Sequence, residues 1–176
     1  MDNRYILTAF GKDRPGIVAD VTRILFENGC NLEDNSMTRL ADEFTLILLF
    51  TCPSTGLDEQ LARECRRLEK DAGISAFIRP LEKRQEVPHN GMTERTLHVE
   101  GMDHAGIVYK VSQYLAGNDV NIVALKSTVR ESPESGSAIY QMDIHIQIPD
   151  GVPLDRLEEG LSAVADELLV DITVSR

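Results

Sequence analysis

The chain has 176 residues, with 18 Lys and Arg against 29 Asp and Glu, which gives a formal net charge of −11. Proteins bind nucleic-acid phosphates through clustered Lys and Arg side chains, so this acidic balance argues against direct binding to DNA or RNA. The sequence has no run of about 18 apolar residues and no basic start typical of a signal peptide, so we expect a cytoplasmic protein that does not enter a membrane.

The first 80 residues alternate between the patterns of strands and helices. Short runs rich in β-branched, aromatic and other apolar residues predict four strands, at 5–10, 31–40, 44–52 and 74–78. Apolar residues at helical spacing predict two helices, one that opens at Pro15 and Gly16 and ends at Gly29, and one over 57–72. The order is therefore βαββαβ.

The second half of the chain repeats the first. Residues 11–38 return as 101–128, a shift of 90 positions (101 minus 11), and later in each copy Pro53 returns as Pro149, a shift of 96 (149 minus 53). Identical residues occupy these pairs of positions: Leu7 and Leu97, Gly11 and Gly101, Asp13 and Asp103, Gly16 and Gly106, Ile17 and Ile107, Val18 and Val108, Val21 and Val111, Leu25 and Leu115, Asn28 and Asn118, Asn31 and Asn121, Thr38 and Thr128.

The repeat predicts two small domains, at 1–80 and 95–176, joined by a charged linker over 81–94 that contains Pro88 and Asn90. The order βαββαβ is typical of the ferredoxin-like α+β fold, in which two helices cover one face of a four-stranded antiparallel sheet. The other face of each sheet is left bare.

The two bare faces differ in character. In the first copy, mostly apolar residues point away from the helices: Ile6, Thr8, Phe10, Thr45, Ile47, Leu49 and Thr51. In the second copy, the same positions are polar: Thr96, His98, Glu100, Gln141, Asp143, His145 and Gln147. Because a continuous apolar patch is unusual on a soluble monomer, we expect the first face to pack against another domain or chain, and a homodimer to form.

Neither histidines nor cysteines predict a metal or cofactor site. His98, Glu100, Asp143 and His145 could gather a metal ion on neighbouring strands, but solvated polar residues are far commoner on an outer sheet face. The cysteines are odd in number, fall in one copy and lack the paired spacing of a zinc site, so we expect reduced structural thiols: Cys30, Cys52 and Cys65.

Each copy carries the pattern Gly-x-Asp-x-x-Gly-Ile-Val, followed by an Asn fifteen residues after the second Gly, at Gly16 and Asn31 in the first copy (31 minus 16). We expect the loop and the start of the next strand to meet. Asp13 could simply accept helix amides and Asn31 could be a turn residue. Together they could also bind a free amino acid, with the carboxylate of Asp13 on its ammonium group and helix amides on its carboxylate. Close approach of such a ligand would account for Gly11 and Gly16.

The segment DRPGIVADVTRILFENGCNL, with the βαββαβ order, resembles the ACT domain, a small regulatory module that binds amino acids, usually at an interface between two modules. The resemblance covers both copies. It implies that Asp13 and Asn31, and their counterparts Asp103 and Asn121, contact the ligand. The second copy departs from the pattern, since His104 stands in the place of Arg14.

The candidate ligand-binding residues are Gly11, Asp13, Arg14, Pro15, Gly16, Ile17, Asn31 and Leu32 in the first copy, and Asp103, His104, Gly106, Asn121 and Ile122 in the second. Glycine and serine are candidate ligands.

Two functions remain open from the sequence. One is a non-enzymatic regulator in which a bound amino acid alters contact with a protein partner, and stand-alone pairs of modules that resemble this chain are taken to bind a transcription regulator. The other is a dissociable regulatory subunit of an amino-acid or one-carbon enzyme. An enzyme is not expected, because the loops lack a phosphate cradle and no Ser, Cys or His recurs as a nucleophile.

Overall fold

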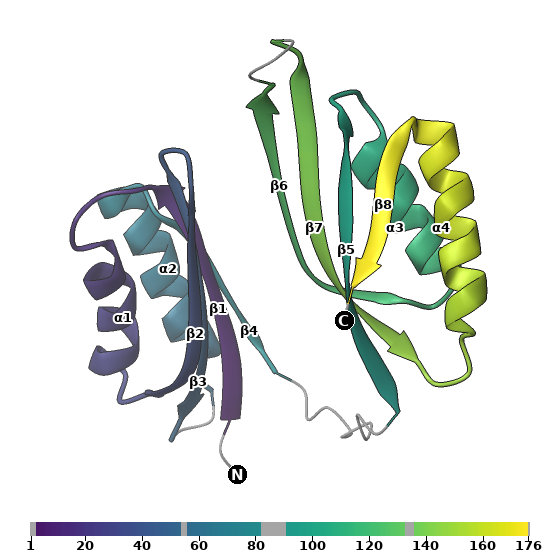
Figure 1. Ribbon diagram of the computed structural model, residues 1–176. Helices are drawn as coiled ribbons and strands as arrows, with labels where there is room; N and C mark the ends of the chain where they lie inside the picture. Colours follow the sequence, from purple (N-terminus) through teal and green to yellow (C-terminus); the bar gives the residue numbers. More distant parts are fainter. Residues whose placement is uncertain (1–2, 54–55, 82–90, 133–135, 176) are drawn as a thin grey trace. The chain divides into compact units, whose positions relative to one another are not determined.

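The computed structural model describes residues 3–53, 56–81, 91–132 and 136–175. The chain divides into two compact units, Met1–Val87 and Pro88–Arg176, and each unit is a sheet covered by a pair of helices (Figure 1). Within the described ranges, no helix is long and apolar enough to cross a membrane.

The first unit has the predicted order. Its elements are β1 (Asn3–Lys12), α1 (Ile17–Glu27), β2 (Asn31–Leu40), β3 (Glu43–Cys52), α2 (Asp58–Ala72) and β4 (Ser75–Pro80). The strands lie in the order β2-β3-β1-β4, with every neighbouring pair antiparallel. This is the ferredoxin-like arrangement, so the predicted α+β fold is confirmed.

The second unit repeats this arrangement. Its elements are β5 (Met92–Met102), α3 (Ile107–Gly117), β6 (Asn121–Glu131), β7 (Ala138–Pro149), α4 (Leu154–Leu168) and β8 (Val170–Ser175), with the strand order β6-β7-β5-β8. β5 begins at Met92 and pairs there with Pro149 of β7, so the last three residues of the predicted linker belong to a strand. Residues 82–90 of that linker lie outside the described residues.

The core of each unit lies between its sheet and its helices. Alternate residues of the central strands point to the helices, as Leu7 of β1 and Leu48 of β3 do in the first unit, where both are buried. Val21 of α1 and Leu61 of α2 meet them from the helical side, in one continuous buried cluster. The periods of strand and helix seen in the sequence therefore place the core correctly.

The contrast between the two outer faces is also present in the structure. Ile47 is 44% exposed, Phe10 is 47% exposed, and Phe77 of β4 joins them because it pairs with Thr8. Leu49 is half-buried. No described residue of the first unit covers this face, and the expectation that another domain or chain packs on it remains a proposal.

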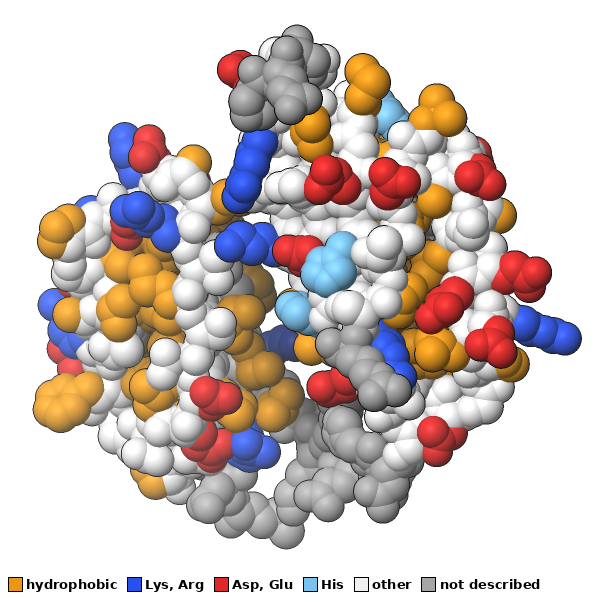
Figure 2. All heavy atoms as spheres, in the orientation of Figure 1, with side chains coloured by type: hydrophobic (Ala, Val, Ile, Leu, Met, Phe, Trp, Pro, Cys, Tyr) orange, Lys and Arg blue, Asp and Glu red, His pale blue; other side chains and the backbone are white. Residues whose placement is uncertain are grey.

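On the second unit, the outer face is polar and its side chains bond to one another. Asp143 lies 2.6 Å from His98, and Gln141 donates a 2.7 Å hydrogen bond to Glu100. Figure 2 shows histidine and acidic side chains next to one another on the surface of this unit. Among the described residues, no three His, Cys, Asp or Glu side chains are arranged to hold a metal ion.

The prediction of reduced thiols is wrong for two of the three cysteines. Cys30 and Cys52 form a disulfide, with their Cα atoms 4.3 Å apart. The bond forms because Asn31, the first residue of β2, pairs with Thr51 of β3, which sets Cys30, just before β2, beside Cys52 at the end of β3. Cys65 is a free buried cysteine, and burial raises the pKa of its thiol to about 11.

Candidate ligand-binding site

The loop between β1 and α1 presents helix amides without a side-chain cap. Gly16 is the N-cap of α1 and has φ 87°, a left-handed conformation that favours glycine, and no side chain bonds to the first amides of the helix. Asp13 is therefore not the helix cap that could have explained its place in the sequence. The first turn of α1 leaves amide donors that a carboxylate could accept.

Asp13 is held by residues at the turn of the β2–β3 hairpin. Its amide donates to the carbonyl of Asp42 at 2.8 Å, and its carboxylate accepts from the guanidinium of Arg39 at 3.4 Å. The side chain of Asp13 is 26% exposed and that of Arg39 is 68% exposed. An ammonium group could therefore replace an exposed and loosely held arginine at this carboxylate. Sequence reasoning missed Arg39, because only the hairpin register brings it to the loop.

Arg14 turns back onto its own helix. Its guanidinium donates to Asp20 at 2.7 Å and to the carbonyl of Pro15 at 3.3 Å. Both side chains of the ion pair are partly exposed. The side chain of Ile17 is buried in the core, so this residue can offer a ligand only its backbone.

The second loop, between β5 and α3, has the same backbone conformation at its glycine, but its side chains make different contacts. Gly106 is the N-cap of α3 with φ 103°, again without a side-chain cap. The ring of His104 donates from Nε2 to the carbonyl of Leu168 at 2.7 Å and from Nδ1 to the carbonyl of Ala105 at 3.2 Å. Only the protonated ring can donate to both carbonyls at once, so these bonds favour the protonated form and raise the pKa of His104. The bond to Leu168 has the larger effect and the bond to Ala105 the smaller one. This ring ties the second loop to the end of α4.

The structure separates the two residues that the sequence analysis expects to meet. Lys12 and Leu40 both pair with Glu43, so Asp13 follows β1 at the end of the sheet where β2 finishes. Asn31 is at the other end of β2, and nine residue steps of about 3.3 Å put it about 30 Å away. The expectation that loop and strand start meet within one copy is wrong, and the same register separates Asp103 from Asn121.

The separation follows from the path of the chain. After the loop, α1 runs back along the sheet, so β2 begins at the same end of the sheet as β1 (Figure 1). No ligand of amino-acid size can contact both residues of one module. A site that uses both needs the loop of one module and the strand start of another.

Gly11 and Gly101 have a structural explanation. A Cβ atom on Gly11 would lie 3.0 Å from the carbonyl oxygen of Gly73, and one on Gly101 would lie 3.0 Å from the Cα of Val170. These glycines let the end of the central strand approach the residues just before β4 in the first unit and the first residue of β8 in the second. Close approach of a ligand is not needed to account for them.

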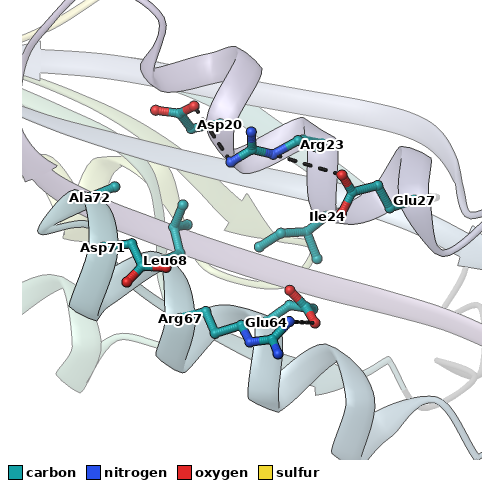
Figure 3. Close-up of a pocket in the computed structure, with 9 residues that line it drawn as sticks. All are labelled: Asp20, Arg23, Ile24, Glu27, Glu64, Arg67, Leu68, Asp71 and Ala72. Carbon is teal, nitrogen blue, oxygen red and sulfur yellow. Dashed lines mark hydrogen bonds and ion pairs between the residues drawn. The ribbon is translucent and has the colours of Figure 1, made fainter.

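Four surface hollows of about 230 to 470 Å³ are present in the described part of the chain, and none of them is lined by a candidate ligand residue. One lies between α1 and α2, where Figure 3 shows Arg23 between Asp20 and Glu27 on one helix and Arg67 beside Glu64 on the other. The candidate residues lie at the two ends of the sheet, which suits a site completed by a second module.

Comparison with known proteins identifies the module. The family model for the ACT domain matches residues 3–78. The glycine cleavage system transcriptional repressor of Escherichia coli is 26% identical over 164 residues, which cover 93% of this chain and 84% of that protein. A UPF0237 protein of Methanococcus maripaludis is 46% identical over 79 residues, which cover 44% of this chain and 87% of that protein.

Solved structures have the same tandem fold. The crystal structure of an unknown protein from Galdieria sulphuraria matches with a TM-score of 0.81 and 27% identity, over 99% of this chain and 98% of that one. A structure provisionally described as a glycine cleavage system transcriptional repressor matches with a TM-score of 0.72 and 22% identity, over 99% and 97% of the two chains, which shows the shared fold. Residues 3–78 of this chain therefore form an ACT domain, and the second βαββαβ unit repeats its strand order.

Proposed function

We propose that this protein is a non-enzymatic, cytoplasmic regulator that binds a free amino acid and thereby alters its contact with a protein partner, a transcription regulator of the glycine cleavage system. The observation that carries the proposal is the similarity to the Escherichia coli repressor, which extends over 93% of the chain and so includes both modules. The net charge of −11 favours action through a protein partner rather than through DNA.

The ligand binds where the loop of one module faces the strand start of another. The carboxylate of Asp13 accepts the ammonium group, and the uncapped amides after Gly16 donate to the ligand carboxylate. Asn31 of the facing module can both donate and accept. This arrangement supports a homodimer, because an isolated module offers only half of the contacts.

The second loop is the weaker binder of the two. His104 already bonds to Leu168 and ties that loop to α4, whereas Arg14 bonds only within its own loop and helix. A ligand at the second loop must approach the ring of His104 beside Asp103, and the protonated form of this ring, which the raised pKa favours, competes with the ammonium group for the carboxylate.

Calorimetry of the full chain with glycine, serine and the other free amino acids tests the proposal. Asp13→Ala and Asn31→Ala should each weaken binding by about 1 to 3 kcal/mol, because each leaves a polar group of the ligand without a partner. Asn35→Ala is the matched control, since it removes the same side chain from an exposed position in the middle of β2. Absence of heat with every amino acid would overturn the sensor proposal.

Capture of the partner tests the second half of the proposal. Immobilised protein, with and without the bound amino acid, should retain a transcription regulator, and the amount retained should depend on the ligand. Retention of a metabolic enzyme in its place would support a dissociable enzyme subunit and contradict the proposed partner.

A further inference from the structure

The Cys30–Cys52 disulfide lies next to a proposed ligand residue. It joins the turn after α1 to the end of β3, and Asn31 is the next residue along the chain. Asn31 and Leu32 pair with β3 at Thr51 and Phe50, but the register then shifts before Asp34. This bulge separates the first two residues of β2 from the rest of the strand. The disulfide is therefore the covalent anchor of a short, isolated stretch of strand.

The second unit has the same backbone without the bond. Val120 and Ile148 stand at the positions of Cys30 and Cys52, and both are buried in the second core. The bulge recurs, with a register shift between Ile122 and Ala124. The amide of Val120 donates to the carbonyl of Leu115 at 3.0 Å, as that of Cys30 donates to Leu25 at 2.9 Å. The fold thus forms with an apolar pair at this place, and the disulfide is not required to build it.

We propose that Cys30 and Cys52 form a reversible thiol–disulfide site, opened by a dithiol reductant, whose redox state sets how firmly the start of β2 is held. The consequence for ligand affinity at Asn31 rests on the function proposed above. The effect of reduction on the mobility of the strand start is independent of that function.

The chemistry balances as ordinary thiol–disulfide exchange. A thiolate of the reductant attacks the sulfur of Cys30, which is only half-buried, and the released Cys52 thiolate takes up a proton. The second thiol of the reductant then displaces Cys30, so the reductant leaves as a disulfide and both cysteines become thiols. Two electrons and two protons pass to the protein.

The third cysteine takes no part in this exchange. Cys65 is buried in the first core, and burial raises the pKa of its thiol to about 11, so little thiolate is present near neutral pH. Reduction therefore acts on one pair. Arg4 continues to hold the bulge residue Glu33 through a 2.6 Å ion pair, so loosening should not extend beyond the bulge.

Hydrogen–deuterium exchange of the full chain, with and without dithiothreitol, tests the proposal, and alkylation under native conditions reports the state of each cysteine. In the reduced protein, the half-buried Cys30 should become alkylated and exchange over residues 30–33 should rise at least tenfold. Exchange over 120–123 should not change, since the apolar pair cannot be reduced. Equal exchange at 30–33 in the two states, or a bond that native reductant leaves intact, would overturn the proposal.

Two variants serve as controls. Cys30→Val with Cys52→Ile copies the second unit, and this protein should show slow exchange that does not respond to dithiothreitol. Cys65→Ala should retain the full response. A response that persists in the double variant would assign it to a different group and contradict the proposal.

Calorimetry with glycine and serine on both redox states separates this proposal from the proposed function. Tighter binding by the oxidised protein is expected. Equal affinity in both states would contradict control of the ligand by the disulfide. If neither state binds any amino acid, the sensor function fails, while the exchange data still decide the redox site.

Discussion

The helix pair of the second unit offers a sharp test of how its packing differs from the first. Gly160 of α4 lies under the ring of Tyr114 of α3, and a Cβ atom at this glycine would lie 2.5 Å from Cζ and 2.7 Å from Cε2 of the ring. The hydroxyl of Tyr114 donates to the carbonyls of Leu157 at 3.2 Å and Arg156 at 3.3 Å. Gly160→Ala must therefore displace a ring that is already bonded.

The free energies set the direction of the effect. Alanine in place of glycine within a helix stabilises by about 1 kcal/mol. Overpacking against the ring destabilises by about 1 to 3 kcal/mol, and weakening of the hydroxyl's hydrogen bonds adds about 1 kcal/mol. Gly160→Ala should therefore lower the free energy of unfolding by about 1 to 3 kcal/mol.

The effect of Gly160→Ala on the free energy of unfolding should change sign when the ring of Tyr114 is removed. The first unit has Ile24 and Glu64 at the two equivalent positions, so an isoleucine and a residue with a Cβ fit together there. In a protein that carries Tyr114→Ile, the further change Gly160→Ala should stabilise by about 0.5 to 1 kcal/mol, because only the helix propensity remains.

Urea unfolding followed by far-UV circular dichroism measures these differences on the full chain. Gly117→Ala, at the end of α3, is the matched control, because nothing lies within 4 Å of its added Cβ atom, and it should not destabilise. A destabilisation by Gly160→Ala of equal size with and without the tyrosine would refute the packing argument.

Three other predictions address the disulfide, the second loop and the outer sheet face. The Cys30–Cys52 bond spans 22 residues, so the chain-entropy relation assigns it about 3 kcal/mol, and dithiothreitol should lower the unfolding free energy of the first unit by that amount in the same urea assay. The pKa of His104 lies above its ordinary value of 6.5, so the two bonds of the protonated ring stabilise the second loop below pH 6.5. This stabilisation is lost as the pH rises through the raised pKa, because the neutral ring can donate to only one of the two carbonyls; a ring titration by NMR at or below 6.5 would contradict this. Ile47→Lys should keep the circular dichroism spectrum and convert a self-associated chain to a monomer in sedimentation velocity, whereas unchanged sedimentation would exclude this face from self-association.

The sequence by itself determined the duplication, the order of elements and the side of each central strand that enters the core. These features follow from periods of two and 3.6 residues, which are local properties of the backbone. The apolar character of Ile47 and the polar character of Asp143 on matching outer faces could be assigned from the same alternation.

Other features depend on which strands become neighbours and in which direction they run. Cys30 and Cys52 meet only because β2 pairs with β3 in one register, and local spacing favoured free thiols. Asp13 and Asn31 recur together in the sequence, but α1 carries the chain back along the sheet between them and leaves them at opposite ends. Closeness along the chain does not predict closeness in space once a helix reverses the path, so only the tertiary structure could show that the two residues of one module lie far apart.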